Sequence, residues 1–172
     1  MSTCYELETS ARPTRPWCLF RGLRRAYAVG LESVVEVVDC ERLVQLPHSP
    51  PRVLGLCMLR RELLPVIGLD RGEEPGSDKT TGRQLVLVLR TGRGTWAVPV
   101  AGEGTAVTQA TLDEPCPPPD TGSPWLTFLG TVRRGETVHA AIDLETTWAH
   151  VRDGVATYHA GGWLDASARG RQ

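Results

Sequence analysis

Residues 53–70 read Val-Leu-Gly-Leu-Cys-Met-Leu-Arg-Arg-Glu-Leu-Leu-Pro-Val-Ile-Gly-Leu-Asp, two apolar runs separated by a short charged corner. Each run has the length and composition of a buried strand. Strands joined by so short a connection fold back on each other as a hairpin. Their apolar side chains enter a core, so we expect Arg60, Arg61 and Glu62 at the rim, where an arginine can contact a partner.

Most of the remaining chain has the same pattern of short apolar or alternating runs divided by glycine, proline and charged turns. Strands are expected at residues 17–23, 26–30, 34–38, 43–46, 84–89, 95–100, 104–109, 126–132 and 137–144. Residues 34–46 are expected to extend the sheet of the first hairpin. Pro65 indicates an edge or bulge position in the second arm of the central hairpin. The chain is therefore predicted to be all-β, with a short helix at residues 146–152.

Composition also predicts how the chain is organised. Residues 1–16 are expected to form a flexible segment, residues 17–152 the folded domain, and the Gly- and Ala-rich residues 153–172 a loosely ordered tail. Residues 71–82 have almost no apolar content, so we expect an exposed loop and a candidate seam between lobes. Residues 113–124 contain three consecutive prolines and are expected to form a stiff loop.

Charge and hydropathy exclude several classes of partner. The 172 residues suffice for one compact domain or two small lobes. The net charge is −1 and no dense basic block occurs, so neither nucleic acid nor a membrane surface is an expected partner. No segment is long and apolar enough to insert into a bilayer. We expect a cytoplasmic protein whose five cysteines remain buried thiols, because none forms a Cys-x-x-Cys pair.

No residue pattern typical of an active site stands out. The four histidines are widely separated, and no serine or cysteine occupies a Gly-x-Ser-x-Gly pattern. Asp113-Glu114 is most simply a solvated turn, and Gly92-Arg93-Gly94 lacks the lysine and helix of a phosphate cradle. The five tryptophans are most simply core or lobe-seam residues. The prediction is therefore no catalytic residue, no metal site and no cofactor.

The order and spacing of several motifs resemble the CheW-like domain of bacterial chemosensory systems. These motifs are Tyr27-Ala28-Val29, Val34-Val35-Glu36-Val37, Leu46-Pro47, Val53-Leu54-Gly55, Met58-Leu59-Arg60, Leu64-Pro65-Val66-Ile67 and, more weakly, Leu129-Gly130 and Ala141-Ile142-Asp143-Leu144. The resemblance implies two small five-stranded SH3-like β-barrels that share a continuous core, with a short C-terminal helix. It also implies an adaptor without catalytic activity, which links the cytoplasmic tip helices of chemoreceptors to the regulatory domain of a CheA-type histidine kinase.

The same resemblance assigns a candidate surface for receptor or kinase binding. Arg60 falls on the arginine of the family's Asn-Leu-Arg-Gly motif and Glu36 on the glutamate of its Val-x-Glu-Ile motif; in the family these two face the receptor and each other. Val34 and Gly55 match flanking positions, although a plain core role fits Val34 equally well. Arg61 replaces the family's glycine and adds a second positive charge. A groove between the barrels is expected to receive a receptor helix by its apolar face.

Departures from the family pattern lie mostly in the second lobe. Gly68 stands where the family has an aspartate, and Ala101-Gly102-Glu103 stands in place of an Asp-x-Val pattern. We therefore hypothesise a divergent adaptor in an array that governs gliding or pilus motility. Two alternatives stay open: a detached regulatory domain of a sensor kinase, and a small β-barrel module for RNA or single-stranded nucleic acid.

Overall fold

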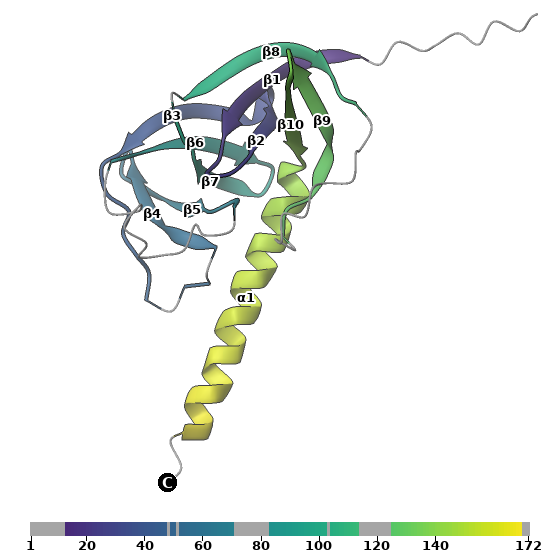
Figure 1. Ribbon diagram of the computed structural model, residues 1–172. Coiled ribbons are helices and arrows are strands. Elements are labelled where there is room, and N and C mark those ends of the chain that lie inside the picture. Colours follow the sequence, from purple (N-terminus) through teal and green to yellow (C-terminus); the bar gives the residue numbers. More distant parts are fainter. Residues whose placement is uncertain are drawn as a thin grey trace, which may run out of the picture.

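A computed structural model describes residues 13–47, 49–50, 52–70, 83–102, 104–113 and 125–169, with side chains up to residue 157 (Figure 1). The strands in these residues are β1 (Thr14–Arg21), β2 (Ala26–Gly30), β3 (Val34–Cys40), β4 (Val53–Leu59), β5 (Glu62–Ile67), β6 (Gln84–Thr91), β7 (Gly94–Pro99), β8 (Thr105–Thr111), β9 (Phe128–Arg134) and β10 (Thr137–Ile142). A 3-10 turn, η1 (Leu31–Ser33), precedes β3, and helix α1 (Leu144–Arg169) follows β10. The predicted mainly-β fold with a C-terminal helix is confirmed.

The strands form two five-stranded sheets, which we call barrel A (order β8-β1-β2-β10-β9) and barrel B (order β3-β6-β7-β5-β4). Each sheet curls until its outer strands approach. Asp113, just after β8, exchanges backbone hydrogen bonds of 2.9 and 3.3 Å with Thr131 of β9. Val44, after β3, exchanges two bonds of 2.8 Å with Leu56 of β4. The architecture of two five-stranded sheets that the resemblance implied is therefore confirmed.

The fold contains an internal repeat: strands β6–β10 are arranged like strands β1–β5, and each barrel takes strands from both repeats. Barrel A combines β1 and β2 with β8, β9 and β10, whereas barrel B combines β3, β4 and β5 with β6 and β7. Hairpins β4–β5 and β9–β10 have the same register, so that Gly55 opposite Val66 corresponds to Gly130 opposite Ala141. Because each barrel takes strands from both halves, the two barrels are not independent folding units.

The structure corrects three expectations about the strands. β3 does not extend the sheet of β1 and β2, because η1 carries the chain across to barrel B; residues 43–46 contribute only the bridge at Val44. Pro65 lies in an inner strand between β7 and β4, and the bulge is in β4 at Leu54. Residues 71–82 lie outside the described residues, but they join β5 to β6 within one barrel and so do not separate the lobes.

β1 begins before the predicted start at residue 17. Residues 14–16 pair with β8 alone, and pairing with β2 begins at Trp17. A proline has no N–H to donate to a second neighbour, so Pro16 is tolerated where only one neighbour is present. Residues 1–12 lie outside the described residues.

Helix α1 is much longer than the predicted helix at residues 146–152. Asp143 caps its start, since its carboxylate accepts hydrogen bonds from the Thr146 backbone N–H at 3.1 Å and hydroxyl at 2.8 Å. Gly154 lies within α1, and the Trp125 indole packs against it, so that a Cβ there would lie 3.2 Å from the nearest ring atom. The segment expected to be a loose tail is helical to Arg169, and α1 projects away from the barrels (Figure 1).

Apolar side chains gather in three clusters. The largest lies between the barrels and α1, which confirms the implied shared core; it includes Phe20, Tyr27, Ile67, Leu87, Leu89, Trp96, Ile142 and Val151. The second fills barrel B and the third barrel A. Asp70 adds a buried polar link between the barrels, since it accepts hydrogen bonds from the Tyr27 hydroxyl at 2.6 Å and the Arg24 backbone N–H at 2.8 Å.

Cys18, Cys40 and Cys57 are buried free thiols. Burial raises the pKa of Cys57 to about 12, and the neighbouring Cys40 thiol adds to the shift. A thiol with so high a pKa is a weak nucleophile at neutral pH. The prediction of buried thiols therefore holds for these three, while Cys4 and Cys116 lie outside the described residues.

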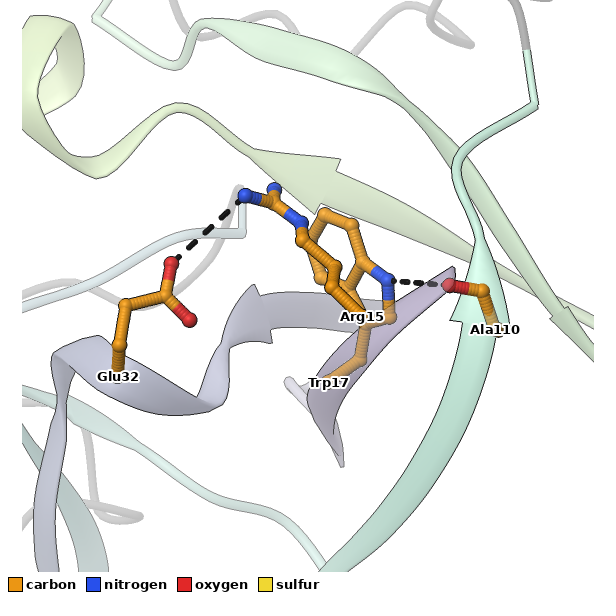
Figure 2. Close-up of polar contacts among 4 residues, drawn as sticks. All are labelled: Arg15, Trp17, Glu32 and Ala110. Atoms are coloured by element: carbon orange, nitrogen blue, oxygen red, sulfur yellow. Dashed lines mark hydrogen bonds and ion pairs between the residues drawn. The ribbon is translucent and has the colours of Figure 1, made fainter. Parts of the chain in front are cut away.

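Barrel A is sealed at the end where β1 begins. Trp17 is fully buried, and its Nε1–H donates to the Ala110 carbonyl of β8 at 3.2 Å (Figure 2). The Arg15 guanidinium lies 3.9 Å from the centroid of that ring and pairs with Glu32 of η1 at 3.7 Å (Figure 2). The Trp17 side chain, covered by the Arg15 guanidinium, thus fills this end of barrel A.

At the other end of barrel A, His139 takes the place that Leu64 has in barrel B. Burial lowers the pKa of His139; a backbone contact with Val132 opposes this shift and the charge of Arg134 adds to it. The folded protein therefore binds this proton less tightly than the unfolded chain. The corresponding stability is present above the unfolded pKa of about 6.5 and is lost as the pH falls through the lower folded value.

We expect His139→Leu to weaken the pH dependence of stability, because leucine removes the buried proton site and fits the equivalent place in barrel B. Denaturant unfolding between about pH 7.5 and 5.5 measures this. The free energy of unfolding should fall more steeply with acid in the wild type than in the variant. Parallel curves for the two proteins would contradict the assignment.

Candidate partner-binding surface

The β4–β5 turn brings Arg60 to Glu36 of β3. The Arg60 Nη2 and Glu36 Oε2 atoms are 3.2 Å apart, and the two side chains are 78% and 25% exposed. An exposed ion pair contributes only about 0 to 1 kcal/mol to stability. The ion pair that the resemblance implied is present, and its contribution to the stability of the fold is small. Its role in binding stays a prediction.

The same turn holds two arginines in an unfavourable backbone conformation. The φ angles of Arg60 and Arg61 are 49° and 72°, as at both central positions of a type I′ turn. For a residue with a Cβ, this left-handed conformation costs about 1 kcal/mol relative to glycine. The corresponding turn of barrel A uses Gly135, with φ 60°, at its first position. Strained residues of this kind cluster where function needs their side chains.

Arg61→Gly is expected to raise the free energy of unfolding by about 0.5 to 1 kcal/mol, because glycine relieves the left-handed strain. Chemical denaturation of the purified variant measures this. Glu62→Gly is the matched control, since residue 62 lies in β5 without a positive φ. The control should be destabilised, and a destabilised Arg61→Gly variant would show that the arginine side chain supports the fold.

The outer face of the β4–β5 hairpin carries an apolar strip, which we define as Leu56, Met58, Leu63 and Pro65. Met58 lies opposite Leu63, and Leu56 lies opposite Pro65. Met58 and Leu63 are 67% and 53% exposed, and adjacent exposed apolar side chains of this kind are typical of interaction sites. The strip ends at the Arg60–Arg61 turn. Sequence reasoning missed Met58 and Leu63, although strand alternation with the inward Cys57 and Leu64 places them outside.

At its other end the strip enters an apolar hollow of about 620 Å³. The hollow lies between barrel B and α1 and is lined by Leu46, Pro47, Ser49, Pro50, Val53, Leu56, Pro65, Ile67, Trp148, Val151, Arg152, Val155 and Ala156. Trp148 is fixed by stacking on Trp96 of β7, with ring centroids 5.3 Å apart. This hollow lies beside α1, whereas the shared core lies between the barrels. The groove expected between the barrels stays a prediction.

The structure brings Glu36, Arg60 and Arg61 to one surface but not Val34 or Gly55. Val34 is half-buried and packs against the shared core, which favours the plain core interpretation. Gly55 is buried with φ 151°, and a Cβ there would lie 2.7 Å from the Val44 carbonyl oxygen. Glycine at this position thus permits the backbone bridge that closes barrel B.

In the part of the chain that the structure describes, no group of three or more potential metal-ligating side chains comes together. Within the same ranges, no helix combines the length and the hydropathy needed to cross a membrane. The surface around the β4–β5 turn offers charge and apolar area to a partner.

Comparison with known proteins agrees with this geometry. The model of the CheW-like domain family matches residues 17–147. The chain is similar in structure to the scaffolding protein TtCheW from Thermoanaerobacter tengcongensis, with a TM-score of 0.58 and 19% sequence identity over 78% of this chain and 92% of that one. No curated protein matches it significantly. The family match spans most of the sequence, and the chain therefore belongs to the CheW-like domain family, a family of non-catalytic scaffolds of chemotaxis signalling.

Proposed function

We propose that this chain is a cytoplasmic adaptor that couples methyl-accepting chemoreceptors to a CheA-type histidine kinase. The observation that carries the proposal is the Arg60–Glu36 ion pair at the end of an exposed apolar strip, on a fold of the CheW-like family. Charge beside apolar area suits an amphipathic helix, which is the form of a receptor tip. The surface needs no reacting group for this role.

The receptor helix would lie along the hairpin strip with its apolar face toward Met58 and Leu63. Arg60 is oriented by Glu36, whereas Arg61 has no carboxylate partner among the described residues. A helix with acidic side chains at this end would therefore find one oriented and one unpaired guanidinium. The second arginine, absent from the family pattern, would favour a more acidic receptor tip than a standard adaptor accepts.

A separate surface would contact the regulatory domain of the kinase. Barrel A exposes Val107, Leu129 and Val138 on strands β8, β9 and β10, away from the β4–β5 turn. Exposed apolar side chains on a second barrel support an adaptor that holds two partners at once. Of the departures from the family pattern, the one at residues 101–103 precedes β8 of this barrel, whereas Gly68 follows β5 of barrel B. We propose that this divergent adaptor serves an array that governs gliding or pilus motility.

Pairwise capture tests this function. The full chain is immobilised and offered, separately, a receptor tip fused to a coiled coil and a kinase regulatory domain from the same cells. We expect both to be retained, with a standard adaptor as the positive control. Loss of the kinase domain alone, under conditions where the control retains it, would contradict the coupling role.

A further inference from the structure

A second cavity, of about 640 Å³, opens at the end of barrel A opposite the Trp17 plug. Its lining comes from β1, β8, β9, β10 and the connection before β8, and includes Arg21, Ala106, Arg134 and His139. It is not part of the surface around the β4–β5 turn. This mouth of barrel A has no role in the function proposed above.

Strand alternation directs three basic side chains toward this mouth. Arg21 is in phase with the buried Trp17 and Leu19 of β1, because side chains two apart share a face. Arg134 is likewise in phase with the buried Val132 of β9. His139 is in phase with the buried Ala141 of β10, and is itself 8% exposed.

Comparison of equivalent positions in the two barrels shows which side chains differ at this mouth. In barrel B, Glu36 pairs across the sheet with Val88, then Ala97, then Val66. The matching row in barrel A starts at Ala106 and runs through Leu19, Ala28 and Ala141. Ala106 therefore stands where barrel B has the carboxylate that pairs with Arg60.

At two further equivalent positions, an apolar residue of barrel B corresponds to a basic residue in barrel A. Leu59 opposite Glu62 and Leu64 opposite Cys57 pack into the core of barrel B. At the same register positions barrel A has Arg134 and His139. Among the described residues neither Arg21 nor Arg134 has a carboxylate partner. In barrel B, apolar residues and an internal ion pair occupy these positions, whereas the described residues at the same positions of barrel A are basic or alanine.

The floor of this mouth holds a polar atom without a partner. His139 Nδ1 is buried and has no hydrogen-bond partner within the described structure. Leaving such a group unsatisfied costs about 1 to 3 kcal/mol. In the tautomer that carries its proton on Nδ1, an acceptor that enters the mouth removes this cost. Carboxylate and phosphate oxygens are acceptors that also pair with the planar guanidinium of arginine.

We propose that the mouth of barrel A is a binding site for a single oxyanion, a carboxylate or a phosphate, held by Arg21 and Arg134 over the ring of His139. The anion takes the place that the Glu36 carboxylate has in barrel B.

Titration with inorganic phosphate at constant ionic strength, followed by amide NMR spectra of the full chain, tests the site. Residues that line the mouth should shift saturably, and Arg134→Gln should weaken phosphate binding roughly tenfold or more through loss of one charge-assisted contact. Arg133→Gln is the matched control, because it removes the same charge from the outer face of β9 and should change affinity less than about twofold. If both variants weaken phosphate binding equally, the effect reflects the net charge of the protein rather than a specific contact, and the proposed site is wrong.

A second variant keeps the proposal falsifiable if Arg134→Gln folds poorly. Ala106→Glu supplies the carboxylate internally, so the variant should fold and no longer respond to phosphate. Acetate in a parallel titration distinguishes the two anions, and saturable shifts at the mouth with either one support the site. Absence of such shifts with both anions, or an unchanged phosphate response in Ala106→Glu, would overturn it.

Discussion

Leu64→Asp is expected to unfold the whole protein rather than one lobe. Leu64 is buried in the core of barrel B, and an aspartate there leaves a buried charge without a partner. Such a change costs roughly 3 to 5 kcal/mol or more, against a typical total stability of about 5 to 15 kcal/mol. Because the largest core cluster contains side chains of both barrels, loss of barrel B also removes packing partners of barrel A.

Circular dichroism and thermal unfolding measure this effect. Leu63→Asp is the matched control, since it puts the same side chain one residue away on the exposed outer face. The control should keep a native spectrum, with a change in stability of about 0.5 kcal/mol or less. A native spectrum for Leu64→Asp would contradict the strand register, and separate melting of two units would contradict the interleaved fold.

Arg60→Glu is expected to reduce receptor-tip binding at least about tenfold while the fold stays intact. The substitution removes an exposed cation that Glu36 orients and places a carboxylate opposite an acidic partner. Arg60→Ala should have an intermediate effect because it removes the charge without reversing it. Titration with a soluble receptor-tip fragment measures the affinity, and thermal unfolding checks the fold.

Two controls separate binding from stability. Arg133→Glu reverses a charge on barrel A and should leave receptor binding within about twofold of the wild type. The melting temperature of Arg60→Glu should stay within a few degrees of the wild type, since an exposed pair contributes little. Unchanged receptor binding, or a large drop in melting temperature, would each contradict the role given to Arg60.

The hairpin of residues 53–70 could be predicted because its signal is local. Two apolar runs and a charged corner predict strands at residues 53–59 and 63–69, and β4 has these bounds while β5 differs by at most two residues at either end. The assignment of β3 to barrel B could not be predicted, because strand pairing depends on partners far along the chain. The length of α1 was missed for another reason: the Gly- and Ala-rich composition of residues 153–172 was taken to indicate a tail, and the packing of Trp125 against Gly154 is a tertiary contact.

The candidate site divides in the same way. Glu36 and Arg60 were found through the family motifs, and their side chains do meet. Gly55 was also predicted as a site residue, but the structure gives it another role. A side chain there would collide with the Val44 backbone, and this contact between separate segments is not visible in the sequence. The exposed Met58 and Leu63 were missed because apolar residues in a strand are first assigned to a core.

Cosedimentation with assembled receptor tips tests the central claim most directly. The kinase regulatory domain is mixed with these assemblies with and without the full chain, and the amount in the pellet is measured. The kinase domain should pellet when the wild-type chain is present and stay in solution without it or with Arg60→Glu. A kinase domain that pellets equally without the chain, or stays in solution when the chain itself is bound to receptor, would contradict an adaptor role.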